Sequence, residues 1–318
     1  MTLQRKSQRM PVHGVLLLDK PVGMSSTQAL AKAKWLLNAQ KAGHTGTLDP
    51  FATGLLPLCF GEATKFAQDL LDADKTYETV VHLGIRTSTG DTEGEVLERL
   101  PVDVTLTQIE SILEKFRGPI SQVPPMHSAL KRDGKPLYEY ARAGITLERE
   151  ARSVTIHKLE LLAYDVPMLR LRVACSKGTY IRVLGEDIGR ALGCGAHLKA
   201  LRRTGVGSLS LDDAVALDDL VALGECRSNA LKPLDALLST LPSIELNDEL
   251  ARRFICGQRL SLIKEAHTTL LKDTGTRVKV MDIYGQLLGV ATLSLESLLT
   301  AERLVSSVDR DDNILPKR

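Results

Sequence analysis

The sequence predicts an α+β protein in two parts: a large N-terminal domain of strands and helices, and a small C-terminal domain of strands. Strand-like and helix-like patterns both occur in the first 240 residues, and no segment repeats. The composition shifts after Leu234, Leu241-Pro242-Ser243 has the character of a linker, and an alternating hairpin pattern follows. The 318 residues, 43% of them hydrophobic, are enough to bury a real core. We therefore expect domains at residues 1–240 and 243–310.

The chain opens with a pattern of strand, turn and helix. The apolar run Val12–Leu18 predicts a strand, and Lys20-Pro21-Val22-Gly23 predicts a turn. Ser25 and Gln28 have the spacing of a capping box, which predicts that a helix begins here. Its apolar face would comprise Ala29, Leu30, Ala33, Leu36 and Leu37.

A glycine- and threonine-rich loop, Gly43–Gly54, comes next and shows no helical or strand periodicity. The β-branched segment Thr76–Leu83 predicts a strand, and Thr87–Gly94 is rich in turn residues. Thr107 and Glu110 suggest a second capping box. The helix that follows would carry the stripe Ile109, Ile112, Leu113 and Phe116 and would end at Gly118-Pro119.

Residues 121–152 lack a steady period, contain Pro124-Pro125 and are rich in Lys and Arg, so we expect an exposed insertion. Leu169–Cys175 alternates as a strand, and a helix is expected from about Tyr180 to Leu192. In the C-terminal part, Arg277–Ile283 and Gln286–Leu293 alternate around Tyr284-Gly285, which predicts the hairpin. The basic start (Arg5, Lys6, Arg9) and the polar tail from Asp309 are expected to be loose ends.

Composition argues against several classes of protein. The five cysteines are dispersed without a C-x-x-C pair, and the seven histidines show no paired ligand spacing, so we expect no disulfide framework and no metal site. No apolar stretch is long enough for a signal peptide or a membrane span, and together with the cysteine pattern this predicts a cytoplasmic protein. The net charge of +2 does not indicate a nucleic-acid partner, so an RNA-binding surface would need local basic clusters.

The loop Gly43–Gly54 is the strongest candidate for chemistry. Its glycines permit tight turns and close approach of a ligand, and Pro50 keeps Asp49 out of a helix. His44 could stack on a base or donate a hydrogen bond. The ordinary alternative is that Asp49 begins an Asx turn and His44 is a surface histidine.

As a whole, this loop resembles the catalytic loop of the TruB family, the bacterial tRNA pseudouridine-55 synthases. Further segments resemble that family's motifs in the same order, and together they span roughly residues 14–207. These segments are Gly14–Ser26, Asp74–Tyr77, Pro125–Lys131 with Tyr138–Arg142, Cys175–Arg182 and Leu201–Gly205. The family has an aromatic residue where His127 stands, so the chain departs from the pattern in the insertion. The C-terminal segment resembles a PUA domain, an RNA-binding β module.

The resemblance implies a role for individual residues. Asp49 would be the nucleophile, Arg182 would pair with its carboxylate, and Tyr77 would pack on the target uracil. The uridine pocket and its surroundings would include His44, Tyr180, Leu201 and Lys20. Apart from the resemblance, local basic clusters predict the contacts to RNA, and their ordinary alternative is a solvated surface. These residues are Lys131, Arg132 and Arg142 of the insertion, with Arg202 and Arg203.

The resemblance also implies a fold and a substrate. The catalytic domain would have the pseudouridine synthase fold, a mixed, largely antiparallel central sheet with flanking helices, followed by a small C-terminal β-rich PUA-like domain. The substrate would be uridine-55 in the T arm stem-loop of tRNA, flipped out for attack at uracil C6 or ribose C1′. Because the reaction is an isomerisation, we expect no cofactor, and we expect a monomer that binds no membrane.

Two other classes of function remain open from the residues alone. An Asp-dependent hydrolase or phosphotransferase would need a second carboxylate beside Asp49 to bind magnesium, and the loop has none. A non-catalytic RNA-binding or RNA-folding module would not need Asp49 together with Arg182.

Overall fold

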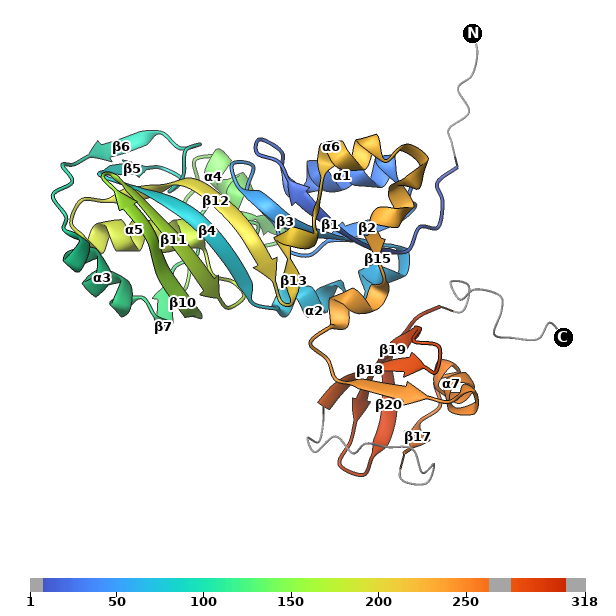
Figure 1. Cartoon of the computed structure of the whole chain (residues 1–318). Helices are drawn as coiled ribbons and strands as arrows, with labels where there is room; N and C mark the ends of the chain where they lie inside the picture. The colour runs from blue at the N-terminus through green and yellow to red at the C-terminus, as the bar shows by residue number, and fades with distance from the viewer. Residues whose placement is uncertain (1–7, 263–275, 307–318) are drawn as a thin grey trace, which may run out of the picture.

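The computed structural model of the chain describes residues 8–262 and 276–306 (Figure 1). They form one large sheet with flanking helices and, after it, a separate five-stranded sheet. The expected loose ends at Arg5, Lys6 and from Asp309 lie outside the described residues, as do positions 307–310 of the expected C-terminal domain.

The large sheet is mixed and mostly antiparallel, as predicted. Its strands are β1 (Gly14–Lys20), β2 (Ala42–His44), β3 (Thr53–Phe60), β4 (Lys75–Leu83), β7 (Gly118–Gln122), β10 (Arg152–Asp165), β11 (Met168–Cys175), β12 (Ala196–Val206), β13 (Leu209–Ser210), β14 (Val215–Ala216) and β15 (Leu231–Lys232). The main path runs β14-β1-β3-β12-β4-β11-β10-β7, and β2, β13 and β15 pair at its side. Two pairs are parallel, β1 with β14 and β3 with β12.

The parallel pair of β3 and β12 joins the two halves of the sheet. It is short, with Thr53 opposite Arg202 and Gly54 opposite Arg203. Gly54 has φ +101°, and a Cβ added there would lie 2.2 Å from the carbonyl oxygen of Arg203. Only glycine permits this backbone conformation and this close approach, so the third glycine of the loop is required where the halves meet.

Helices cover the sheet (Figure 1). The α-helices of this domain are α1 (Ser26–Leu36), α2 (Ala67–Asp72), α3 (Leu106–Lys115), α4 (Leu137–Arg142), α5 (Ile181–Ala191) and α6 (Leu217–Ala222). Short 3-10 helices η1 (Gly61–Lys65), η2 (Leu211–Asp213), η3 (Gly224–Ala230) and η4 (Leu234–Leu238) connect them, and β5 (Ile85–Thr87) pairs with β6 (Val96–Arg99) in a small separate hairpin.

The predicted helix starts are right in two cases and wrong in one. The capping box of Ser25 and Gln28 begins α1, and α5 spans the expected segment with Tyr180 as its N-cap. For α3 the capping box is formed by Thr105 and Gln108, not by Thr107 and Glu110. Both pairs have the same spacing, and Thr105 is the residue that directly precedes the first helical turn.

Three long strands were not predicted. The expected loop Gly43–Gly54 is bounded by β2 and β3, and β10 and β12 cross the sheet where no strand was expected. β3 is buried on both faces and contains Pro57, so it shows neither alternation nor a clean β pattern. The strand segments that do alternate or are β-branched, β4 and β11, were predicted nearly to the residue.

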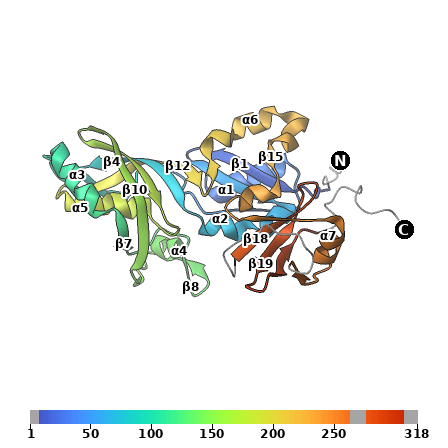
Figure 2. The same cartoon turned by 60° about the horizontal axis from the view of Figure 1, so that its bottom comes forward.

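The predicted insertion leaves the sheet after β7 and returns at β10. It carries a two-stranded hairpin of β8 (Lys131–Arg132) and β9 (Lys135–Pro136), followed by α4. Figure 2 shows α4 and β8 projecting away from the sheet beyond β7 and β10. Most of these residues are exposed, as expected.

The C-terminal domain has its own core and is strand-rich, as predicted for a PUA-like module. Its sheet has the order β16-β18-β19-β20-β17 and packs against helix α7. The elements are β16 (Ser243–Leu246), α7 (Asp248–Ile255), β17 (Leu260–Ser261), β18 (Thr276–Asp282), β19 (Leu287–Leu293) and β20 (Leu298–Leu304). β18 and β19 form the predicted hairpin. The described part of the chain contains no helix of the length and apolar character that a membrane span requires.

Candidate active site

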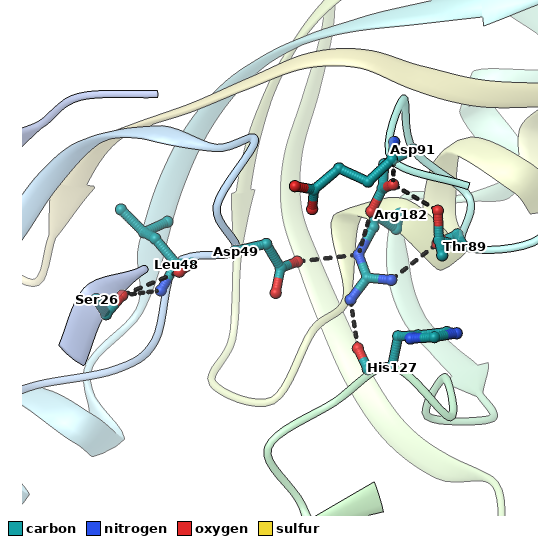
Figure 3. Close-up of polar contacts among 8 residues, drawn as sticks. Ser26, Leu48, Asp49, Thr89, Asp91, His127 and Arg182 are labelled. Carbon is teal, nitrogen blue, oxygen red and sulfur yellow. Dashed lines mark hydrogen bonds and ion pairs between the residues drawn. The ribbon is translucent and has the colours of Figure 1, made fainter. Parts of the chain in front are cut away.

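Asp49 lies in the loop between β2 and β3, and the loop is anchored to α1. Ser26 Oγ donates to the carbonyl oxygen of Leu48 at 2.9 Å and accepts from the N–H of Leu48 at 2.8 Å (Figure 3). Ser26 is buried, so this single hydroxyl fixes both backbone groups of the residue before Asp49. The Asp49 side chain keeps 36% of its surface exposed and faces outward from this anchor.

Arg182 lies in the first turn of α5 and reaches Asp49 from the other half of the sheet. Its Nε donates to Asp49 Oδ2 at 3.0 Å, Nη1 to the Thr89 carbonyl at 2.8 Å and Nη2 to the His127 carbonyl at 2.6 Å (Figure 3). The guanidinium is only 4% exposed. Because three of its nitrogens are directed by the protein, it is preorganised beside the carboxylate before any substrate binds.

A second carboxylate, Asp91, completes this cluster and was not predicted. It is 4% exposed, and its Oδ2 lies 3.5 Å from Arg182 Nε. Asp91 Oδ1 accepts from Thr89 Oγ1 at 2.5 Å and from the N–H of Glu93 at 2.9 Å. In the sequence, Asp91 is one acidic residue within the turn-rich stretch Thr87–Gly94. Nothing in that pattern indicates that it contacts a helix about ninety residues later.

The surroundings of Asp49 oppose its ionisation, and Arg182 partly restores it. Burial raises the pKa of Asp49 above the ordinary value for an aspartate, and Asp91 adds to this, whereas the charge and hydrogen bond of Arg182 lower it. Without the guanidinium the carboxyl would be protonated at a higher pH and would be a poorer nucleophile.

Asp49 opens into a cavity of about 390 Å³ that also reaches the insertion. Tyr77 of β4, Tyr180 and Leu201 of β12 line it, as predicted from the resemblance, together with Asp49 and Arg182. Two aromatic side chains and a leucine beside a carboxylate offer a flat apolar slot for a base. Arg203 of β12 lines the cavity too, so the structure brings together six of the predicted site residues from four separate elements.

Two predicted site residues, Arg203 and Lys20, are buried. Arg203 was expected on an RNA-binding surface, but it is 1% exposed, and its guanidinium donates to the carbonyls of Leu55 and Gly46. These bonds connect β12 to the loop at Gly46 and to β3 at Leu55. Lys20, expected near the substrate, is fully buried and donates to the carbonyls of Pro21 and Met24, and burial lowers its pKa to about 8.

Of the other predicted contacts, Arg202 is partly exposed and forms an ion pair with Asp19 at 2.7 Å. His44 lies on β2 outside the lining of the cavity, and burial, with Arg203 nearby, lowers its pKa, which favours the neutral imidazole. The described residues contain no group of three His, Cys, Asp or Glu side chains that could bind a metal ion. Asp91 does supply a second carboxylate, but Arg182 lies against both acids and would compete with a divalent cation there.

Comparison with known proteins decides the family. Three family models match in succession: "TruB family pseudouridylate synthase (N terminal domain)" over residues 34–181, "tRNA pseudouridylate synthase B C-terminal domain" over 182–242, and "Pseudouridine synthase II TruB, C-terminal" over 242–305. The chain is 61% identical to the tRNA pseudouridine synthase B of Ralstonia pickettii (strain 12J), over 95% of this chain and 96% of that protein. It is 59% identical to that of Burkholderia mallei (strain NCTC 10247), over 93% and 98%.

The chain belongs to the TruB family of pseudouridylate synthases. The resemblance predicted from the sequence motifs is thereby confirmed, and with it the class of enzyme, an isomerase.

Solved structures agree with the TruB assignment. A Cbf5-Nop10-Gar1 complex matches with a TM-score of 0.71 and 28% identity, over 92% of this chain and 84% of that chain. An H/ACA RNP bound to a substrate RNA containing 2'-deoxyuridine matches with a TM-score of 0.72 and 26% identity, over 93% and 86%. The pseudouridine synthase fold predicted for the TruB resemblance is therefore confirmed.

Within the TruB chain, the insertion touches the site directly through His127. The carbonyl of His127 binds Arg182, and the side chain lines the cavity. Lys131, Arg132 and Arg142 are exposed further out, and the Arg142 guanidinium lies 5.3 Å from the ring centre of Tyr138. Position 127, where a departure from the family pattern was expected, therefore lies in the lining of the cavity.

Proposed function

We propose that this chain isomerises uridine-55 in the T arm stem-loop of tRNA to pseudouridine, with Asp49 as the nucleophile. The curated relatives are named for action on tRNA. The observation that carries the proposal is a partly exposed carboxylate at 3.0 Å from a buried arginine, in the lining of a base-sized cavity that Tyr77 and Tyr180 also line.

The proposed reaction needs nothing that these groups do not supply. The N1–C1′ bond of the uridine breaks, the uracil turns, and a new bond forms between C5 and C1′. C5 loses its proton, N1 takes up a proton once its bond to C1′ is broken, and no electrons are gained or lost overall. Attack by Asp49 at either C6 or C1′ divides this change into two easier steps and is then reversed.

The target uridine must leave its stack to reach Asp49, which costs a few kcal/mol. In this proposal, stacking on Tyr77 and contacts from His44 offset that cost. The exposed Lys131, Arg132 and Arg142 of the insertion, with Arg202, bind the phosphate backbone. Residues 1–240 form the catalytic domain, and residues 243–310 form a PUA-like domain that binds RNA. The chain acts as a monomer in the cytoplasm.

The deciding experiment follows tritium released from C5 of uridine in a tRNA transcript, with no metal or nucleotide added. About one equivalent should be released by the wild-type protein and none by Asp49→Asn, which keeps the size of the side chain but removes its charge. Asp49→Asn should bind the tRNA within a few-fold of the wild-type affinity. A folded wild-type protein that binds tRNA and releases no tritium would make the chain an RNA-binding relative and Asp49 a turn residue.

A further inference from the structure

Gln122 lies at the root of the insertion and is almost completely buried. β7 ends at Gln122 and β10 begins at Arg152, and the two residues are directly opposite in the sheet. Residues 123–151 therefore leave and re-enter the sheet through this pair. With 2% of its surface exposed, Gln122 makes no contact with solvent that would account for an amide here.

Both polar groups of the Gln122 side chain bind the backbone of one residue, Tyr180. Its Oε1 accepts from the N–H of Tyr180 at 3.0 Å, and its Nε2 donates to the carbonyl of Tyr180 at 3.3 Å. A single amide that binds both the N–H and the carbonyl of one residue acts as a neighbouring strand would. It fixes both the position and the orientation of that residue's backbone.

Apart from Gln122, the Tyr180 carbonyl accepts from the N–H of Leu184 at 3.1 Å, whereas the Tyr180 N–H is bound by Gln122. It is the N-cap of α5 in an extended conformation (φ −101°, ψ 106°), and its own side chain makes no capping hydrogen bond. The Tyr180 side chain lines the base slot, and Arg182 follows two residues later. A shift of the Tyr180 backbone would therefore move both the wall of the slot and the partner of Asp49.

We propose that Gln122 is a positioning residue for the isomerisation: its amide sets the place of Tyr180 in the uridine slot and, through the first turn of α5, the place of Arg182 beside Asp49. This inference rests on the function proposed above. It deepens that function by assigning a role to a residue that touches no substrate.

Two substitutions separate the hydrogen bonds from the packing. Gln122→Met keeps the length of the side chain and removes both bonds, and kcat for tritium release should fall about 10- to 100-fold, because small displacements of reacting groups have effects of that size. KM for tRNA should stay within a few-fold. Gln122→Glu keeps the acceptor for the Tyr180 N–H and loses the donor to the Tyr180 carbonyl. The kcat of this variant should therefore lie between those of the wild-type protein and Gln122→Met. Hydrogen exchange of the peptide containing Tyr180 should quicken in Gln122→Met.

Gln108→Met is the matched control, because Gln108 also makes a paired capping contact, but on the exposed start of α3. It should lower thermal stability and leave kcat unchanged. The inference is overturned if Gln122→Met, assayed well below its melting temperature, retains the wild-type kcat while the wild-type protein turns over. Wild-type protein that releases no tritium overturns the proposed function itself, and the positioning role of Gln122 with it.

Discussion

At the scale of single residues, the arginine between two acids controls the charge of Asp49, the proposed nucleophile. Arg182 donates to Asp49 and lies against buried Asp91, so it is one cation shared by two carboxylates. Because burial raises the pKa of Asp49 and Arg182 opposes this, the ionised form of Asp49 depends on the guanidinium. The pH at which activity falls on the acidic side of the pH profile, here called the acid limb, should therefore depend on Arg182.

The first prediction concerns that limb. If Asp49 acts as proposed, activity requires its ionised form and is lost as pH falls through the pKa of Asp49. Removing the charge in Arg182→Met removes an influence that lowers this pKa, so the limb should move to higher pH, with a rate loss of about 100-fold or more. Arg182→Lys retains a charge and should shift the limb less. Single-turnover tritium release measured across pH tests this, and a limb that does not move in Arg182→Met would contradict it.

A second prediction concerns Gly54. A Cβ there would meet the Arg203 backbone at 2.2 Å in a left-handed conformation, so Gly54→Ala must push β3 away from β12. We expect a loss of more than about 1 kcal/mol in the free energy of unfolding, measured with urea. Gly43→Ala, in the same loop, has open space around its Cβ and no such φ. It should change stability by less than about 0.5 kcal/mol, and equal effects of the two substitutions would refute the argument.

At the scale of elements, the insertion has two parts that make different contacts. We call the residues next to the sheet its root and the hairpin of β8 and β9 its tip. Its root contacts the site through Gln122 and His127, and its tip presents Lys131 and Arg132 on an exposed hairpin. The tip should therefore govern RNA affinity and the root the chemistry.

The third prediction concerns RNA binding by the basic residues at the tip of the insertion. Reversing both charges in Lys131→Glu/Arg132→Glu should reduce the slope of log affinity against log salt by roughly one to two, because each lost phosphate contact removes about 0.7–0.9. The control Lys32→Glu/Lys115→Glu makes the same change of charge on exposed positions of α1 and α3. If the two double variants have the same slope, the insertion does not bind the backbone.

Elements were predictable from sequence where the local pattern is unambiguous. β4, β11 and the hairpin of β18 and β19 show clear alternation or β-branching, and Ser25 with Gln28 marks the start of α1. β3 is buried on both faces, so its sequence carries no period that separates strand from buried loop. For α3, two capping pairs compete at neighbouring positions, and local spacing alone cannot rank them.

At the scale of the whole molecule, the C-terminal domain is attached to the catalytic domain by charges and a small apolar contact. Arg277 pairs with Asp69 and with Glu302, Lys65 donates to the Leu304 carbonyl at 3.2 Å, and Val290 and Val305 join an apolar cluster of the catalytic domain. The orientation of the two domains thus depends on contacts that a few substitutions can alter.

The fourth prediction tests this attachment. Arg277→Glu places like charges against Asp69 and Glu302. It should weaken the contact between the domains by up to about 1 kcal/mol, as expected for a partly exposed pair. Protease cleavage near Leu241-Pro242 should therefore increase. Swapping the charges in Arg277→Glu/Asp69→Lys should restore much of the protection. Cleavage that stays high in the swapped variant would show that the pair does not hold the domains together.

The site as a whole was predictable only through the family motifs. Asp49 and Arg182 are 133 residues apart, and no local pattern links them. Asp91 and Gln122 lie in segments where sequence shows only turns and an irregular insertion, because their roles arise from tertiary contacts. Arg203 was misplaced for the same reason: in the sequence a buried arginine that binds carbonyls cannot be distinguished from one on the surface.

The order of the sheet also dictates when the molecule acquires its activity during synthesis. β4 is flanked by β11 and β12, which follow it by about a hundred residues, so it emerges from the ribosome without either partner. Until Val206 has been translated, β3 lacks the strand that connects it to the half carrying Arg182. A nascent chain therefore exposes Asp49 early but cannot place Arg182 beside it until about two thirds of the protein exists. It must stay unaggregated through that interval with β4 unpaired.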